Sequence, residues 1–450
     1  MSAPSISYIS HVRATIALAW PVIAGQLGHI IIGQVDNLMI GQLGATELAA
    51  CALANGLFFL VVVFGFGLTS ALLPITAEAI GAKTMQKKGQ KILREGLWIT
   101  TIMTFVFIGV LILFIECLPH LGQDPKVVPL AQSYLRIISI SVVPMLFFLI
   151  FKHFIEGFGQ TKPGMYIMIF MVFLNILFNW LFIYGGWGIP AMGLDGAGWG
   201  TLLSRTLGLF MILFYLMRTP SFGAYVNKSM LFQKDKSLRN KILSIGIPSG
   251  LQFFFEVGAF SAAVILAGRI DENAQSAHQI AISIASFTYM FYMGTAAAAS
   301  IRIGKAYGRR DESFIRKAGI ASFLTGLLFV VLFILIMLLF RGPFSTVYID
   351  DPLVSPLIYD LLLIAILFQL FDGIQAVAQG ILRGVQDVKV PAMIAFVAYW
   401  LIGIPSAWFL SEYLEWGLVG IWLALTLGLA FGALALSLRF YTRLVQIKSI

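Results

Sequence analysis

Residues 98–115 read WITTIMTFVFIGVLILFI and contain neither a charged side chain nor a proline. The hydrocarbon core of a bilayer is about 30 Å thick and is crossed by about 20 apolar helical residues, so this stretch predicts a transmembrane helix. Stretches of the same kind recur along the whole chain. They predict an all-α integral membrane protein with twelve transmembrane helices, at residues 12–41, 48–80, 92–117, 127–156, 163–186, 190–217, 241–268, 273–304, 316–341, 354–383, 390–411 and 415–441.

The composition excludes a water-soluble fold. Hydrophobic residues make up 59% of the chain and charged residues 11%, and the mean hydropathy is +0.91, whereas soluble domains contain roughly 45–50% apolar and about 25% charged residues. The first apolar stretch is long enough to span a bilayer, so we expect a retained helix rather than a cleaved signal peptide. Cys51 and Cys117 lack metal-ligand spacing and are interpreted as packing residues, and no cofactor is expected.

Positive charges are concentrated in alternate connections between the spans. The net charge of +9 is by itself typical of nucleic-acid-binding proteins, but basic connections also mark the cytoplasmic side of a membrane protein. The alternation therefore predicts a multi-pass membrane protein with both termini in the cytoplasm, and it explains the charge without a nucleic-acid partner. We expect this protein in a bacterial inner membrane. The basic connections lie at residues 83–94, 152–162, 218–241, 302–317 and 383–389.

The two halves of the chain repeat one pattern. A shift of 227 residues places Pro21 on Pro248, and because six spans separate the copies, both have the same orientation, as in parallel transporter repeats. We therefore expect two pseudo-symmetric six-helix bundles, residues 1–225 and 226–450, joined by the polar linker 219–240. The other pairs are Gly41 with Gly268, Ala79 and Gly81 with Ala306 and Gly308, Gly157 and Lys162 with Gly384 and Lys389, and, at a shift of 224, Gly193, Leu194 and Gly196 with Gly417, Leu418 and Gly420.

Three acidic residues lie inside apolar spans: Asp36, Glu256 and Asp372. An acid at the centre of a membrane helix costs roughly 2.5–3.5 kcal/mol on insertion scales, so each one indicates a functional site. Counting 1.5 Å per helical residue from the span ends places Glu256 and Asp372 near mid-membrane and Asp36 nearer the outer end.

None of the three acids recurs as an acid in the other half of the chain. The shared scaffold therefore does not require them, and we predict that they bind the coupling cation; pairing with a neighbouring hydroxyl or helix end is the structural alternative. The shift of 227 aligns Asp36 with Ala263, Glu256 with His29 and Asp372 with Met145.

Polar residues near these acids keep helical spacing, as Gln252 does before Glu256 and Gln375 after Asp372. In hydrocarbon such stripes face a cavity or a partner helix, which predicts a polar cleft in each half. Aromatic residues beside the stripes suit greasy cations through stacking and cation–π contact, although packing or lipid contact is the alternative for each ring. The candidate substrate-binding aromatics are Phe287, Tyr292 and Phe368.

No enzymatic constellation is visible in the sequence. It contains no nucleotide-binding glycine loop, no clustered metal ligands and no nucleophile elbow. Two-lobed helical repeats of this size are mostly transporters, so we expect a secondary active transporter rather than an enzyme.

Short motifs surround the membrane acids and the repeated prolines. They are LAWP at 18–21, GQVDNLMIG at 33–41, Ile247-Pro248 leading to Glu256, AHQ at 277–279 and GVQD at 384–387. Together they resemble the MATE (multidrug and toxic compound extrusion) family over essentially the whole chain, and the three acids in these contexts are similar to its NorM-like branch.

The resemblance implies a V-shaped pair of six-helix bundles that alternates access and exports drugs against Na⁺ or H⁺. It implies that Glu256 and Asp372 form a second-lobe cation site, the candidate Na⁺ ligands. In family members a tyrosine is often found one turn before the second-lobe aspartate, whereas this chain has Phe368, which removes one hydroxyl ligand. The first-lobe network carried over is Asp36 with Asn175, Asn179, Asp195 and Thr201, and the substrate-contact positions carried over are Gln279 and Asp351.

Two alternatives stay open in the sequence. Na⁺ favours hard oxygen ligands, which both halves offer, so ligand type does not discriminate between Na⁺ and H⁺ as the coupling ion. The alternative function is a flippase for lipid-linked saccharides, which requires a cationic cavity, whereas the in-membrane bases Arg136 and Arg205 are isolated in the sequence. We expect a monomer whose partners are amphipathic, often cationic drugs, a monovalent cation and the lipid bilayer.

Overall fold

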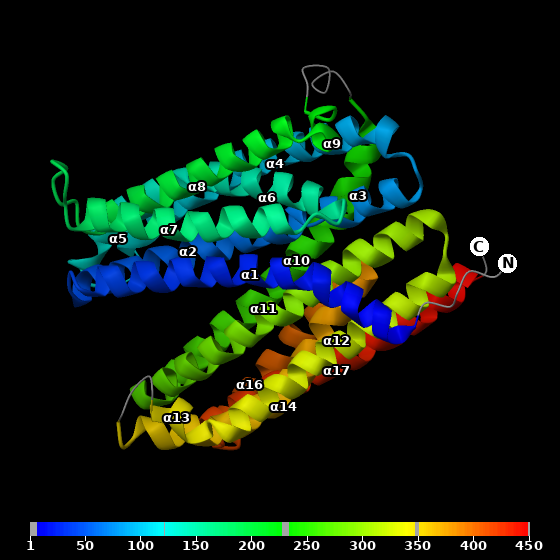
Figure 1. Cartoon of the computed structure of the whole chain (residues 1–450). Helices are drawn as coiled ribbons and strands as arrows, with labels where there is room; N and C mark the ends of the chain where they lie inside the picture. Colours follow the sequence, from blue (N-terminus) through cyan, green and yellow to red (C-terminus); the bar gives the residue numbers. More distant parts are fainter. Residues whose placement is uncertain (1–6, 121, 227–233, 347–350, 449–450) are drawn as a thin grey trace. The chain divides into compact units, whose positions relative to one another are not determined.

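The helices begin and end close to the limits of the apolar stretches. The computed structural model describes residues 7–120, 122–226, 234–346 and 351–448, so residues 227–233 of the predicted linker lie outside the described residues. Within the described ranges, twelve helical segments are long and apolar enough to cross a membrane. The predicted all-α class and the predicted number of spans are confirmed, and Figure 1 shows the course of the helices.

The first half contributes α1 (Tyr8–Gly41), α2 with α3 (Ala45–Thr69 and Leu72–Gly81), α4 (Met85–Cys117), α5 with α6 (Val127–Ile140 and Val142–Gly157), α7 (Lys162–Ile183) and α8 (Leu194–Arg218). The second half contributes α10 (Lys236–Ile270), α11 (Glu272–Arg309), α12 (Glu312–Leu339), α14 (Val354–Gly384), the span α15–η3–α16–η4 (Lys389–Phe396, Val397–Gly403, Ile404–Trp408 and Phe409–Tyr413) and α17 (Gly417–Lys448). In the described ranges, short helices occupy three connections: η1 (Leu118–His120), α9 (Pro220–Gly223) and α13 (Arg341–Thr346).

Two spans of the first half are broken where the equivalent spans of the second half are continuous. Pro74 is the third residue of α3 and Pro144 the third residue of α6. Proline has no N–H and fits best near the start of a helix, and each of these two spans restarts just before its proline. The repeat places Ile301 and Phe371 at these positions, and there α11 and α14 run without a break.

The span at residues 389–413 contains two π-helical segments, η3 and η4. Its first-half counterpart, α7, is a regular α-helix. A π-turn inserts extra residues into a helix and is often found at functional sites. The second half therefore differs from the first in this span too, and η3 carries Tyr399 and Trp400.

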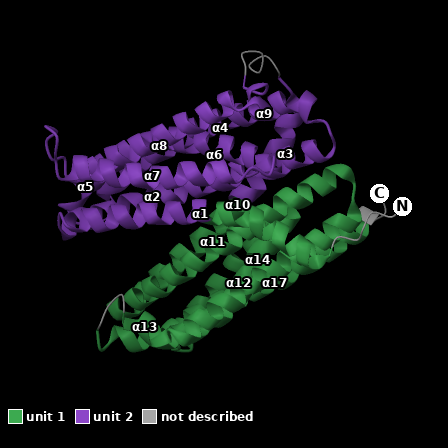
Figure 2. Cartoon of the chain, in the orientation of Figure 1, with its two compact units in different colours: residues 1–23, 251–450 green, residues 24–250 purple. Residues whose placement is uncertain are grey.

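The chain forms two compact units, shown in Figure 2. Unit 1 comprises residues 1–23 and 251–450, and unit 2 comprises residues 24–250. The sequence division at residues 225 and 226 follows the repeat, whereas the compact units assign the start of α1 and the start of α10 to the opposite halves. Both unit boundaries lie two residues after a proline inside a helix, Pro21 in α1 and Pro248 in α10.

Each unit has its own apolar core. In unit 2 the core lies mainly among α2, α4, α5 and α6, with Phe107 and Tyr134 among its large side chains. In unit 1 it lies mainly among α10, α11, α14 and α17, around the fully buried Trp422. The buried acids must therefore be accommodated between helices that otherwise pack apolar side chains.

The start of α1 is held in unit 1 by an arginine of α11. Arg302 donates from Nη1 to the main-chain oxygen of His11 at 2.7 Å and to the hydroxyl of Thr15. Its guanidinium also lies over the ring of Phe314, 5.5 Å from the centroid. This attachment is made by one cation with neutral groups.

The start of α10 is held in unit 2 by ion pairs. Glu95 of α4, which is fully buried, accepts from Arg239 Nε at 2.7 Å and from the main-chain N–H of Asp235 at 2.9 Å. Lys241 pairs with Glu78 at 2.5 Å. The two equivalent segments are thus attached by different chemistry.

Candidate functional site

Asp36 lies in unit 2 at the meeting point of α1, α7 and α8. Its Oδ1 accepts from Asn179 Nδ2 at 2.5 Å, and its Oδ2 accepts from the Thr201 hydroxyl at 3.3 Å. Asn175 Nδ2 in turn donates to the Thr201 oxygen at 3.1 Å. Asn175 and Asn179 are four residues apart and so share one face of α7. Four of the five residues predicted for the first-lobe network are therefore in one hydrogen-bonded cluster.

Asp195, the fifth residue predicted for this network, is hydrogen-bonded to a residue outside it. Its Oδ2 accepts from the hydroxyl of Ser133 on α5 at 2.7 Å. Asp195 lies in the first turn of α8, six residues and about 9 Å along the helix from Thr201. No hydrogen bond joins it to Asp36 among the described residues, so its place in the network stays a prediction.

Close packing of α7 against α8 depends on Gly200. A Cβ at this position would lie 2.3 Å from Asn179 Oδ1 and 3.1 Å from the main-chain nitrogen of the same residue. Glycine lets the two backbones approach, and this approach brings Thr201 within reach of Asp36.

Arg205 is an isolated charge in the sequence, but in the structure it contacts residues of other helices. It donates from Nη1 to the Ser141 hydroxyl at 2.6 Å, and its guanidinium lies 5.2 Å from the centroid of Phe58. It is also close enough to Asp36 and Tyr134 to interact electrostatically with both. The sequence signal was a lone arginine inside an apolar span; its partners come from other helices, which spacing along the chain could not show.

Glu256 and Asp372 lie in unit 1, on α10 and α14. Their residues are only 4% and 3% exposed, and Glu256 is close enough to act electrostatically on Asp372. Neither carboxylate has a good hydrogen bond to another described residue, and Glu256 Oε2 is a buried oxygen without a partner. The structure therefore brings the two predicted second-lobe acids together as an incompletely paired set.

Two tyrosine hydroxyl groups reach this pair, one from α11 and one from η3. The Tyr289 hydroxyl on α11 lies next to Glu256 without good hydrogen-bond geometry. The Tyr399 hydroxyl in η3 accepts from Gln375 Nε2 at 2.5 Å and lies close to both acids. Phe368 lacks the hydroxyl of the tyrosine that family members often have at this position, but Tyr289 and Tyr399 supply hydroxyl groups of the same kind.

A second glycine supports the unit 1 site. A Cβ at Gly432 of α17 would lie 2.2 Å from Gln375 Oε1. The indole of Trp400 donates to the main-chain oxygen of Phe255 at 3.1 Å. The π-helical segment η3 is thus tied both to α14 and to the residue before Glu256.

The predicted substrate residues of α11 and α14 do not share one surface. Gln279 and Phe287 are exposed on α11. Tyr292 is fully buried and donates to Gln369 Oε1 at 2.8 Å. Phe368 is also buried, with ring centroids 6.0 Å from Phe260 and 5.4 Å from Trp422. Tyr292 and Phe368 therefore belong to the packed interior of unit 1. Of the four predicted substrate residues on α11 and α14, Gln279 and Phe287 are the exposed ones.

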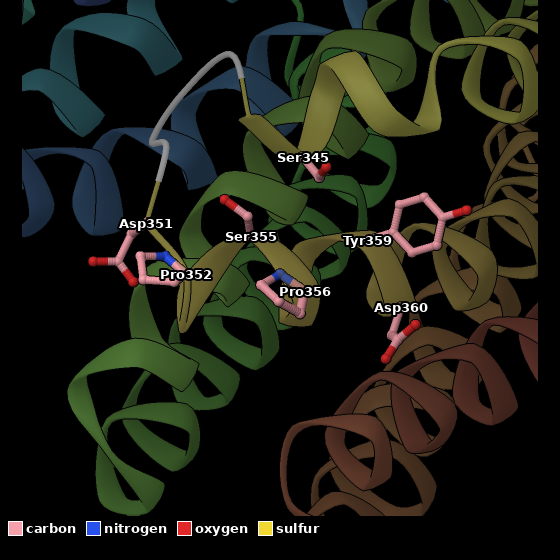
Figure 3. Close-up of a pocket in the computed structure, with 7 residues that line it drawn as sticks. All are labelled: Ser345, Asp351, Pro352, Ser355, Pro356, Tyr359 and Asp360. Atoms are coloured by element: carbon pink, nitrogen blue, oxygen red, sulfur yellow. The ribbon is translucent and has the colours of Figure 1, made fainter.

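Asp351 lies at an open cavity of about 420 Å³ at the start of α14, shown in Figure 3. Its carboxylate accepts from the main-chain N–H groups of Leu353 and Val354 at 2.8 and 3.1 Å, so it also caps the helix. Other walls of the cavity are formed by Ser345, Pro352, Ser355, Pro356, Tyr359 and Asp360.

The acids do not form a conventional metal centre. Among the described residues, no three or more His, Cys, Asp or Glu side chains are grouped so that they could hold a metal ion. A cation at either site would therefore depend on one or two carboxylates together with neutral oxygens. Buried amide oxygens of Asn175, Asn179 and Gln375 have no hydrogen-bond partner, and such oxygens suit a hard cation.

Twelve apolar spans in two repeats of the same orientation, with acids buried in both compact units, define the class of secondary transporters. The MatE family model matches residues 21–181 and again residues 248–409. Because the two matches begin at Pro21 and Pro248, they support the repeat that the sequence predicted. The chain belongs to the MatE family, whose members are transporters and not enzymes.

Curated bacterial relatives match over nearly the whole chain. The probable multidrug resistance protein NorM of Mesorhizobium japonicum is 34% identical over 98% of this chain and 96% of its own length. The multidrug resistance protein MdtK of Proteus mirabilis is 30% identical over 96% of each chain. Together with the twelve spans, these relatives identify a multi-pass bacterial membrane protein.

Solved structures show the same fold at low sequence identity. The crystal structure of the eukaryotic MATE transporter AtDTX14 superposes with a TM-score of 0.88 at 20% identity, covering 98% of this chain and 99% of that one. A crystal structure of MATE in the straight conformation gives a TM-score of 0.89 at 20% identity, covering 98% and 97%. The predicted MATE-like fold is confirmed.

Proposed function

We propose that this protein exports amphipathic, often cationic drugs from bacteria by exchanging them for Na⁺ or H⁺. The observation that carries the proposal is the pair of buried acids in unit 1, Glu256 and Asp372, which lie close together with few neutral donors around them. The names of the NorM and MdtK relatives support multidrug resistance as the biological outcome.

The unit 1 site needs a positive charge. Arg383 is close enough to Glu256 to act on it electrostatically, but it supplies one positive charge for two acids. Two carboxylates that are taken out of water within electrostatic range of each other cannot both remain ionised without a second counter-charge. A proton, a sodium ion or a cationic drug can each supply it. The inward-moving cation and the cationic drug would compete for the same acids, and this competition would couple their movements.

The unit 2 site offers a different cation environment. Asp36 is already hydrogen-bonded at both oxygens, so we expect a cation there to be held by the carboxylate together with the neighbouring oxygens of Asn175 and Thr201. Such a site can bind the coupling cation without collapsing when it leaves, because its donors keep the carboxylate in place.

Substrate contacts are proposed at Gln279 and Phe287, which are exposed on α11, and at the cavity that contains Asp351. An exposed aromatic ring can stack on a planar cation, and a carboxylate at the cavity favours positive charge. Tyr292 and Phe368 would contact substrate only after the interior of unit 1 rearranges.

The orientation belongs to the same proposal. The alternation of basic connections supports a protein of the inner membrane with both termini in the cytoplasm. A single charge moved through 100 mV gains about 2.3 kcal/mol, whereas exchange of one monovalent drug for one Na⁺ or H⁺ is electroneutral. The number of cations exchanged per drug therefore decides whether the membrane potential contributes.

The experiment is transport of a fluorescent organic cation by the purified protein in liposomes. A Na⁺ gradient and a pH gradient are imposed separately and then together, and drug accumulation is measured in each case. We expect one gradient to drive uptake and the membrane potential alone to do less.

Glu256→Gln is the matched variant, because it keeps the size and shape of the side chain and removes its charge. We expect this variant to reconstitute normally and to lose gradient-driven uptake. Uptake that neither gradient stimulates would contradict antiport, and full coupling in Glu256→Gln would remove the unit 1 site from the mechanism.

A further inference from the structure

A groove on the surface of unit 2 lies between the start of α7 and the end of α8. It has a volume of about 570 Å³. Three of its aromatic rings, those of Tyr166, Phe210 and Phe214, are 58–62% exposed. An exposed apolar groove in a membrane span is covered by hydrocarbon rather than by water, so its natural occupant is an acyl chain.

Two cations stand at the polar end of this groove. Lys162, the first residue of α7, lines it directly. Arg218, the last residue of α8, lies over the ring of Phe214 at 5.3 Å from the centroid. In the described part of the chain neither side chain has a carboxylate partner. Glu156, the acid nearest to Lys162 in the chain, is buried and paired with Lys152.

The repeat shows what a neutralised version of this place looks like. In unit 1, Asp387 accepts from Arg439 Nε at 2.7 Å and from Arg443 Nε at 2.6 Å. The shifts of 227 and 224 place Gln160 on Asp387 and Tyr215 on Arg439. In unit 2 the equivalent contact is a neutral hydrogen bond, from the Tyr215 hydroxyl to Gln160 Oε1 at 2.9 Å.

Unit 1 therefore contains a carboxylate that pairs with two arginines near the end of α17. In unit 2 the positions equivalent to these three charged residues are neutral: Gln160, Tyr215 and Thr219. The charge at the unit 2 groove is positive and is left for an external anion. The apolar wall runs from the cationic end along α8 from residue 215 back to residue 207, which is about 12 Å of helix. An anionic head with an attached hydrocarbon chain matches both parts.

We propose that this groove binds an anionic phospholipid, with the phosphate between Lys162 and Arg218 and an acyl chain along Phe210 and Phe214. Basic residues beside apolar grooves at the cytoplasmic ends of spans recognise anionic head groups in this way. The proposed lipid site is separate from the buried acids, because it is formed by cations and contains no carboxylate. Its test does not depend on transport.

The experiment measures lipid binding to the full-length protein purified in detergent and stripped of lipid. Phosphatidylglycerol and phosphatidylcholine with identical acyl chains are titrated, and bound lipid is counted by native mass spectrometry. We expect phosphatidylglycerol to bind more tightly. The double variant Lys162→Gln with Arg218→Gln should lose about fivefold in affinity for each charge removed while keeping its weaker binding of phosphatidylcholine.

Lys389→Gln is the matched control, because Lys389 is the repeat equivalent of Lys162, is also exposed and starts α15. It should bind phosphatidylglycerol as the wild type does. Phe210→Ala should weaken both lipids equally, since it shortens the apolar wall and leaves the charges. Equal binding of the two lipids by the wild type, or an unchanged preference for phosphatidylglycerol in the double variant, would overturn the proposal. Inorganic phosphate that abolished all binding of phosphatidylglycerol would overturn it too, because it would identify a phosphate site that does not hold an acyl chain.

Discussion

The buried acid of unit 2 and the buried acids of unit 1 are held in opposite ways. Asp36 accepts a hydrogen bond at each oxygen and has Arg205 near it. Glu256 and Asp372 lie near each other, and no good hydrogen bond to a described residue satisfies either carboxylate. A buried carboxylate with donors is stable as an anion. Two neighbouring carboxylates without donors require a positive charge beyond that of the arginine near them, Arg383, which acts electrostatically on Glu256.

The comparison shows that repeat symmetry extends to the scaffold and not to the chemistry. The spans, the prolines inside α1 and α10 and the unit boundaries recur at one shift. The acids, Gly200 and the attachments of the exchanged segments do not, whereas Gly432 has an equivalent in Gly208 at the shift of 224. The following predictions test this asymmetry, from the largest expected effect to the smallest.

Asp36→Asn and Asp372→Asn should both reduce drug export to about a tenth or less, equivalent to about 1.4 kcal/mol or more on the coupled step. Their effects on stability should differ in sign. Asp36→Asn turns an amide toward the donors Asn179 and Thr201 and should cost about 1–3 kcal/mol, whereas Asp372→Asn removes repulsion from Glu256 and should be neutral or stabilising. Liposome transport and equilibrium unfolding in mixed detergent measure the two effects; equal destabilisation by both would erase the contrast.

Gly200→Ala should destabilise unit 2 by about 3 kcal/mol, the upper part of the range for overpacking. The new methyl group would meet the backbone of Asn179 as well as its side chain, and backbone cannot rotate away. Gly432→Ala should cost only about 1 kcal/mol, because the obstacle is the movable end of Gln375. Unfolding measurements on both variants test the order, and a larger loss in Gly432→Ala would contradict it.

The attachments of α1 and α10 should respond differently to paired substitutions. Glu95→Gln combined with Arg239→Gln should show a coupling of about 2 kcal/mol, because a buried charge loses a charged partner. Arg302→Gln combined with His11→Ala should couple by only about 1 kcal/mol. His11→Ala removes the bond that Arg302 Nη2 donates to the neutral ring nitrogen His11 Nδ1 at 2.8 Å, but it keeps the main-chain oxygen that accepts from Nη1. Double-mutant cycles of unfolding free energy provide the measurement, and equal coupling would show that both attachments are of one kind.

Among these residues, Asp235 should make the smallest contribution to the free energy of unfolding, and its contribution should depend most strongly on pH. The N–H of Leu238, and then the Lys91 ammonium, hold the pKa of Asp235 below its usual value of 3.8. A depressed pKa means that the stabilisation is present above the unfolded pKa and is lost as the pH falls from about 4 through the folded pKa. Asp235→Ala should cost about 1 kcal/mol at pH 7 through the lost helix cap.

The control for this last prediction is Asp235→Asn, which keeps a capping oxygen without the charge. Its stability relative to the wild type should be lower at pH 7 and should converge with it on acidification, as followed by thermal unfolding. A difference that stays constant between pH 7 and pH 3 would mean that the carboxylate is not ionised in this role.

Much of the unit 2 site could be predicted, and less of the unit 1 site. Asn175 and Asn179 stood out because polar residues at helical spacing are rare in an apolar span, and the family resemblance added Thr201. Neither Tyr289 nor Tyr399 was predicted as a hydroxyl ligand of the acids, because tyrosine is common in membrane helices and nothing in the chain shows that its hydroxyl lies near an acid. Tyr289 could be noticed only as one of the aromatic residues beside the polar stripes. Arg205 was visible as a charge, but its partners Ser141 and Phe58 belong to other helices.

The sequence by itself determined the twelve spans, the parallel repeat and the three buried acids. These follow from the cost of placing polar groups in hydrocarbon, which acts on each residue wherever its neighbours are. Only the tertiary structure decided that α1 and α10 exchange their first segments between the compact units, that Glu256 and Asp372 meet while Asp195 turns to Ser133, and that η3 brings Tyr399 to the acids. Those outcomes depend on which helix faces pack together, and packing is a property of pairs of segments far apart in the chain.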